Sequence, residues 1–115
     1  MNIQIYSSKK NFNVQKAERF FKERKIIFTS IDLTKHNIGK RELDLFIKAA
    51  GSAEKLIDRN DKKTNKHPVA LVFTEDLIRD AILQDSSCLI SPIVRNGDKI
   101  TFGADELVWK SWIED

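Results

Sequence analysis

Few side chains in this sequence belong to the types that perform chemistry. The chain has one cysteine, Cys88, and two histidines, His36 and His67, which stand far apart. A lone cysteine cannot form an internal disulfide, and the histidines lack partners at the spacing of metal ligands. We therefore expect no metal site and no cofactor. Cys88 precedes the apolar pair Leu89-Ile90, which favours a buried, inert thiol; a reactive thiol is the alternative.

A second candidate for chemistry lies where an expected strand meets an expected helix. Residues 2–6 alternate between polar and apolar side chains, and apolar residues recur at helical spacing from Val14 to Phe21. The N–H groups and dipole at the start of a helix favour anions, including thiolates. Lys9 and Lys10, in the polar loop before the helix, are therefore candidate anion contacts, with solvated lysines as the alternative. The loop contains no cysteine.

Periodicity, turn residues and caps predict the other elements. Thr74 is an expected helix N-cap, and Gly51 is expected to end a helix. Asp58–His67 reads as a charged loop, and Val69–Phe73 as either a strand or a buried loop. The expected strands span residues 2–6, 26–32, 88–95 and 99–102, the last two joined by an Asn-Gly turn. The expected helices span residues 13–24, 40–50, 75–84 and 105–113, with a short helix at 53–57.

Several apolar side chains have a predicted environment. Core packing is expected for Leu77, Leu107, Val108 and Trp112. Trp109 is a candidate for an exposed position on a partner surface. Phe12 is unusual in a polar loop, and it either packs under the first helix or is exposed as a contact residue.

The order of the elements predicts the fold class. A strand–helix–strand unit opens the chain, helices follow, and a hairpin and a helix close it. The first two strands need a crossover and are therefore parallel, whereas the hairpin is antiparallel. We expect an α/β fold with one mixed four-stranded sheet, helices on both faces and a helical insertion between the two halves. The 115 residues are expected to form a single domain, 1–115.

Composition and charge argue against several classes of function. Hydrophobic residues make up 41% of the chain and charged residues 32%, as in a globular protein with a core. No apolar run is long enough to span a bilayer, and no signal peptide is visible, so we expect a cytoplasmic protein without membrane contact. A net charge of +3, spread along the chain, argues against direct nucleic-acid binding. We expect a monomer.

The element order, with Pro92 at the start of the third strand, resembles the thioredoxin fold. More narrowly, the chain is similar over about residues 2–113 to the arsenate-reductase/Spx family of thioredoxin-like proteins. That resemblance implies a cis bond before Pro92 and the helical insertion. It rests on Ile5-Tyr6, Lys10, Lys16-Ala17, Ile31-Asp32, Glu42-Leu43, Gly51, Leu56-Ile57, Ser91-Pro92-Ile93-Val94 and Phe102-Gly103.

The chain departs from the family at the positions that carry its chemistry. Asn11 stands where the family has its nucleophilic cysteine, and Val14 stands at the second cysteine or serine. An amide is not nucleophilic. The family's three oxyanion-binding arginines align with Asn60, Ser91 and Ala104. The family-site positions are therefore Lys10, Asn11, Val14, Asn60, Ser91 and Pro92, and Arg59, one residue before Asn60, is a third candidate anion contact.

Three functional hypotheses follow. The leading one is a redox-inactive module that binds or regulates another protein. Spx-like relatives bind an RNA polymerase subunit through a surface that includes a glycine aligned with Gly51, which makes Gly51 a candidate partner contact. The second is a glutaredoxin-dependent arsenate reductase or another thiol oxidoreductase, which would have to use Cys88 or bound glutathione. The third is an accessory protein of an unrelated pathway.

Overall fold

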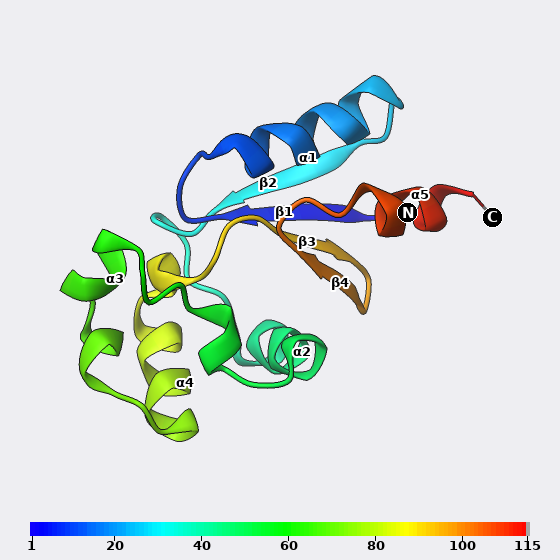
Figure 1. The fold of residues 1–115 in the computed structure, drawn as a ribbon. Helices are drawn as coiled ribbons and strands as arrows, with labels where there is room; N and C mark the ends of the chain where they lie inside the picture. The colour runs from blue at the N-terminus through cyan, green and yellow to red at the C-terminus, as the bar shows by residue number, and fades with distance from the viewer. Residues whose placement is uncertain (115) are drawn as a thin grey trace. The chain divides into compact units, whose positions relative to one another are not determined.

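The two ends of the chain together build the sheet. In the computed structural model, which describes residues 1–114, Met1–Asp32 and the residues from Ser91 onward form one compact unit, and Leu33–Ile90 forms a second (Figure 1). The first unit contains β1 (Ile3–Ser7), α1 (Phe12–Glu23), β2 (Phe28–Asp32), β3 (Ile93–Asn96), β4 (Lys99–Phe102) and α5 (Glu106–Ile113).

The strands form one mixed sheet in the order β2-β1-β3-β4. β1 pairs with β2 in parallel and with β3 in antiparallel, so that Ile5 lies between Ser30 and Val94. β3 and β4 form a hairpin whose turn contains Gly97, with φ +63°. That left-handed conformation suits glycine, as the Asn-Gly turn requires. The predicted mixed sheet is confirmed.

The core of the first unit lies between the sheet and the helices α1 and α5. It contains Ile3, Ile5, Ala17, Phe20, Phe21, Val94, Trp109 and Trp112. Trp109 is fully buried beside Phe20 and Phe21, with ring centroids 5.3 and 5.4 Å away. Its indole N–H donates to Thr101 Oγ1 at 2.8 Å, which satisfies the polar end of the buried ring.

The burial of α5 corrects the sequence prediction. Leu107 is 81% exposed and Val108 37% exposed, whereas Trp109 is buried with Trp112. An eight-residue helix presents a narrow stripe to the sheet. Two tryptophans at i and i+3 occupy that stripe, so the neighbouring aliphatic residues face solvent.

The second unit consists of short helical segments. Gly51 ends α2 with φ +101°, as expected of a helix C-terminal glycine. Leu77 was expected in the core but is 50% exposed. The α-helices are α2 (Lys40–Ala50), α3 (Lys62–Lys66) and α4 (Glu75–Gln84), and the 3₁₀ turns are η1 (Glu54–Leu56), η2 (Pro68–Leu71) and η3 (Ser86–Cys88).

Two local predictions were wrong for identifiable reasons. The charged loop before His67 contains α3, because Asp61 caps it by accepting from the Lys63 N–H. The stretch after it begins as a 3₁₀ turn, with Pro68 at its first position and His67 as its cap. Thr74 is the N-cap of α4, as predicted, although its side chain makes no capping hydrogen bond.

Two expected strands begin later in the chain than predicted. η3 occupies the residues before β3, which begins at Ile93 and not at Cys88. β2 begins at Phe28, and Ile27 before it is 90% exposed. None of the helices within residues 1–114 has the length and apolar character that crossing a bilayer requires.

Candidate functional site

The loop after β1 lies against the start of β3, and Asn11 joins the two. Asn11 is the N-cap of α1, and its Oδ1 accepts a hydrogen bond from the Val14 N–H at 2.9 Å. Its Nδ2 donates to the Ser91 carbonyl oxygen at 3.1 Å. The Ser91–Pro92 bond is cis, the isomer that the resemblance implies, and Pro92 is buried. One amide therefore holds the helix start against the residue before Pro92.

Ser8 makes a second connection to the same residue. Its N–H donates to Ser91 Oγ at 2.7 Å, and the two hydroxyl oxygens lie 3.0 Å apart. Ser8 is only 6% exposed. We call Ser8, Asn11, Ser91 and Pro92 the Asn11 site.

The Asn11 site holds backbone segments together and offers no strong nucleophile. A carboxamide has no lone pair comparable to a thiolate and no pKa in the physiological range. Both ends of this amide are already used, one as an N-cap acceptor and one as a donor to a carbonyl. Replacing an N-cap asparagine by alanine costs roughly 0.5–2 kcal/mol. The geometry thus gives Asn11 a structural role.

The neighbouring candidate residues have other surroundings. Lys9 and Lys10 are exposed, and Lys10 Nζ lies 3.4 Å from Glu18 Oε1. The Lys10 side chain is 71% exposed, so the ion pair contributes little to stability. Val14 is buried in the core face of α1. Anion binding at the two lysines stays a prediction.

In the second unit, Arg59 is committed to its own neighbours. Its Nε and Nη2 donate to the Glu54 carboxylate at 2.8–3.0 Å. Nη1 donates to the Val69 carbonyl and Nη2 to the Val72 carbonyl, at 3.0 and 2.8 Å. The guanidinium also lies over the Phe73 ring. All three nitrogens therefore serve internal contacts, and the candidate anion contact Arg59 acts as a cross-link.

Asn60 and Gly51 also belong to the second unit. Asn60 is exposed, and its N–H donates to Asp58 Oδ1 at 3.0 Å in a local turn. Gly51 is exposed at the end of α2, where its N–H donates to the Ile47 carbonyl at 2.7 Å. Its left-handed φ accounts for the glycine without a partner. A role for either residue in binding stays a prediction.

Cys88 is buried and has the properties of a structural thiol. It is 4% exposed, and its Sγ–H donates to the Asp85 carbonyl at 3.5 Å. Burial, with a further contribution from the Asp85 carboxylate, raises the pKa of the Cys88 thiol to about 12. A thiol that stays protonated at neutral pH is a poor nucleophile. The structure supports the inert alternative.

His67 is likewise engaged by the backbone. Its Nδ1 accepts from the Val69 N–H at 3.0 Å, and its Nε2 lies 2.9 Å from the Asp85 carbonyl oxygen. This pattern requires the proton on Nε2 and leaves no ring nitrogen for a ligand. Within residues 1–114, no group of three metal-ligating side chains is gathered.

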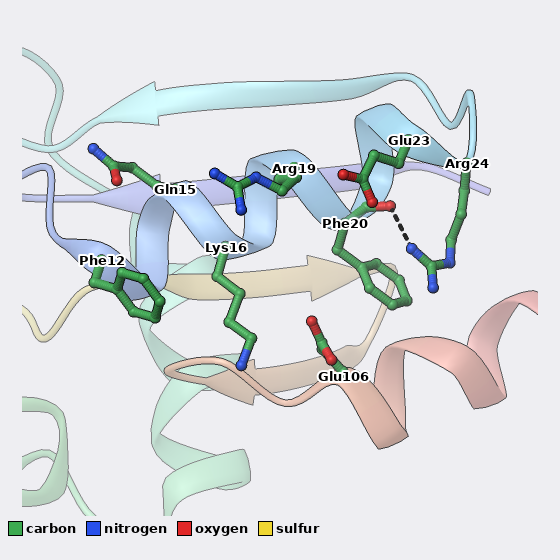
Figure 2. A pocket seen from close by; sticks show the side chains of 8 residues that line it. All are labelled: Phe12, Gln15, Lys16, Arg19, Phe20, Glu23, Arg24 and Glu106. Carbon is green, nitrogen blue, oxygen red and sulfur yellow. Dashed lines mark hydrogen bonds between the residues drawn. The ribbon is translucent and has the colours of Figure 1, made fainter.

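A groove along α1 was not anticipated from the sequence. Figure 2 shows Phe12, Lys16, Phe20 and Arg24 on one side of α1, with Glu106 on α5 opposite Lys16. The groove encloses about 210 Å³. The alternation of aromatic and cationic residues at four-residue intervals was the signal in the sequence, because such residues share one helix face.

Comparison with solved structures identifies the fold. An arsenate-reductase-related protein from Brucella melitensis matches with a TM-score of 0.67 and 22% identity, covering 100% of this chain and 97% of its own. An arsenate-reductase-family-related protein from Bacteroides fragilis matches with a TM-score of 0.78 and 16% identity, covering 96% and 97%. The arsenate reductase from Vibrio cholerae matches with a TM-score of 0.73 and 14% identity, covering 90% of each chain.

These likenesses span nearly the whole chain and establish a thioredoxin-like fold of the type found in arsenate-reductase-related proteins. No protein-family model matches the chain. No curated protein sequence matches it either. The fold is therefore shared at low sequence identity, and chemistry has to be argued from the residues of the site.

Proposed function

We propose that this protein is a redox-inactive relative of the arsenate-reductase/Spx-like proteins and acts by binding another protein. The observation that carries the proposal is Asn11. It stands at the family's nucleophile position, and both ends of its amide are hydrogen-bonded into the backbone. Arsenate reduction requires a thiolate that attacks arsenic, and an amide cannot supply one.

The remaining thiol and the oxyanion positions support the same conclusion. Cys88 is buried, with a pKa raised to about 12. Bidentate arginines hold tetrahedral oxyanions well, but the aligned positions carry Asn60, Ser91 and Ala104. The adjacent Arg59 is bound to Glu54. A protein that has this fold but neither the nucleophile nor the cationic clamp would act through its surface, by binding a partner.

An enzymatic function is the competing proposal, because the structural neighbours include proteins named as arsenate reductases. The test is NADPH consumption in the presence of arsenate, glutathione, glutaredoxin and glutathione reductase. We expect the rate with the wild-type protein to equal the rate without protein. Turnover above that background would refute the proposal, and its loss in Cys88→Ser would assign the reaction to that thiol.

Binding itself is tested by capture from a lysate with the immobilised protein. A specific partner should be retained equally by the wild type and by Cys88→Ser, because no thiol takes part. An RNA polymerase subunit is one partner to examine, by analogy with Spx-like proteins, and Gly51→Ala would then weaken capture. If every captured protein is released by dithiothreitol or lost with Cys88→Ser, the interaction is a mixed disulfide and the proposal fails.

A further inference from the structure

The groove between α1 and α5 is lined by both apolar and cationic side chains. Phe12 is the first residue of α1 and is 73% exposed. Phe20, two turns further on, is 3% exposed and contributes to the floor. A single exposed apolar side chain on a convex surface needs no explanation. An exposed phenylalanine beside a concave surface, however, is typical of contact sites, where aromatic residues are enriched.

The cations of α1 differ in whether the protein already engages them. Lys10 is paired with Glu18. Arg24 lies over the Phe20 ring, with its Cζ 3.7 Å from the ring centroid, and donates to the Phe20 carbonyl. Lys16 and Arg19 line the same groove, and the described part of the chain gives neither of them an ion pair. These two charges are available to a ligand.

The two ends of the groove carry different side chains. Arg24 covers Phe20 at the C-terminal end of α1, while Phe12 is exposed at the N-terminal end (Figure 2). Lys16 extends toward the α5 side, where Glu106 projects from the opposite side of the groove. The groove therefore presents the Phe12 ring and the cations Lys16 and Arg19 on the α1 side, and the Glu106 carboxylate on the α5 side.

The size of the groove limits its occupant. At about 210 Å³ it is smaller than the 300–1,000 Å³ usual for small-molecule and cofactor pockets. It has room for a side chain or two of a larger partner. Glu23 and Glu106 also line it and would repel a continuous run of phosphates, which argues against a nucleic acid.

We propose that this groove binds a linear acidic segment of a partner protein, which places an aromatic side chain beside Phe12 and an adjacent carboxylate against Lys16 and Arg19. Aromatic pairs and charge-assisted hydrogen bonds supply the recognition. Glu106 sets the orientation by rejecting a carboxylate at the far side. This inference rests on the proposed protein-binding function and names the surface and the chemistry of the partner.

The experiment uses an array of fluorescein-labelled 12-residue peptides. Each peptide has one central Phe or Trp, flanked on either side by glutamates or by serines, and fluorescence anisotropy measures its binding to the full chain. We expect saturable binding of acidic aromatic peptides that weakens with added salt. Replacing their glutamates by glutamine, or the aromatic residue by alanine, should weaken binding roughly tenfold or more.

Matched variants test whether this groove is the site. Phe12→Ser and Lys16→Glu should each weaken binding by a similar factor. Leu107→Ser removes an apolar side chain that is 81% exposed on α5, and Lys99→Glu makes the same charge change at the exposed first residue of β4. Neither of these residues lines the groove, and both controls should bind like the wild type. Circular dichroism should show that all four variants are folded.

Several results would overturn the inference. The first is that no peptide binds saturably. The second is that peptides with glutamine in place of glutamate bind as tightly as the acidic peptides. The third is that the groove variants and the control variants lose the same amount of affinity. Tighter binding of a 12-nucleotide oligo-dT probe that is lost with Lys16→Glu would assign the groove to nucleic acid. If a partner captured from lysate is retained by Phe12→Ser and Lys16→Glu, the protein-binding function stands and only its location here is wrong.

Discussion

Asn11 donates one hydrogen bond and accepts another through one side chain, and this explains why an asparagine suits the start of α1. The Oδ1 satisfies the Val14 N–H at the start of α1, and the Nδ2 satisfies the Ser91 carbonyl. Aspartate would keep the first bond and place a carboxylate against the carbonyl. Alanine would lose both bonds. The asparagine therefore stabilises the start of α1 and its contact with Ser91 through two hydrogen bonds that a cysteine side chain would not provide.

The first prediction restores a thiol at this position. Asn11→Cys should place a sulfur at the N-terminus of α1, near the basic loop. Unfilled N–H groups and positive charge stabilise a thiolate, so its pKa should fall from about 8.5 toward the range of roughly 3.5–7.5. The rate of alkylation by iodoacetamide against pH, followed by mass spectrometry for each thiol, measures this value.

Cys88 is an internal control in that experiment, because it should stay unmodified at the same pH. If the introduced thiol titrates near pH 8.5, like a free cysteine, the helix start does not stabilise a thiolate, and the alignment at Asn11 loses its support.

The second prediction concerns the pH dependence that Cys88 imposes on stability. Its folded pKa is raised from 9.0 to about 12, so between these values the unfolded chain loses a proton that the folded chain keeps. The folded state then binds more protons, and the free energy of unfolding falls as pH rises. The slope approaches about 1.4 kcal/mol per pH unit.

Urea unfolding of the wild type and Cys88→Ala between pH 8 and 10.5 checks this prediction. All other ionisable groups are common to both proteins, so the difference between the two slopes isolates Cys88. If the unfolding free energies of the two proteins change equally with pH, the Cys88 thiol ionises equally in the folded and unfolded states.

At the scale of elements, Arg59 connects segments of the second unit that secondary structure does not join. It binds Glu54 in η1 and the carbonyls of Val69 and Val72 at and after η2. Its hydrogen bonds lower the pKa of the Glu54 carboxyl. Short helical turns bury little surface by themselves, so their arrangement depends on such side-chain bonds.

The third prediction follows from that cross-link. Arg59→Met keeps an apolar stem but leaves Glu54 and two carbonyls without their donor, so we expect a loss of roughly 1–3 kcal/mol in unfolding free energy. Arg59→Lys keeps the charge but not the planar fork and should recover only part of that loss. Urea denaturation measures both. A lysine variant as stable as the wild type would show that charge alone matters.

For the whole molecule, the fold of arsenate-reductase-related proteins is present, and the loss of their chemistry is our proposal. The chain matches arsenate-reductase-related structures over nearly its full length at 14–22% identity. The sequence resemblance aligns Asn11, Asn60, Ser91 and Ala104 with the family's nucleophile and its three arginines, and our proposal that the chemistry is absent rests on that alignment. Catalysis by such a site needs the nucleophile and the cationic clamp together, because each alone stabilises only part of the transition state.

The fourth prediction tests that dependence. Asn11→Cys should give a reactive thiol and still show no arsenate reduction above background in the glutaredoxin-coupled assay. The nucleophile would be present but the three arginine positions would stay neutral. Adding Asn60→Arg, Ser91→Arg and Ala104→Arg to Asn11→Cys should raise turnover in the same assay. Substantial turnover by the single variant would contradict our account of the missing clamp.

The sequence by itself determined the parts of the fold that depend on local pattern. The helices at 40–50 and 75–84 and the strand at 99–102 begin and end where periodicity and caps place them. Gly51 and the Asn-Gly turn adopt the left-handed conformations that their residue types favour. The absence of a nucleophile at Asn11 is likewise a property of residue type, since no tertiary contact makes an amide attack.

Only the tertiary structure decided which apolar and charged residues face inward. Trp109, and not Leu107, enters the core, because the sheet accepts one narrow stripe of a short helix. Arg59 binds a carboxylate five residues away and carbonyls ten and thirteen residues away, partners that a local pattern does not identify. The exposure of Phe12 depends on whether any neighbour covers the first turn of α1. Such outcomes depend on contacts between segments distant in sequence, and periodicity contains no information about them.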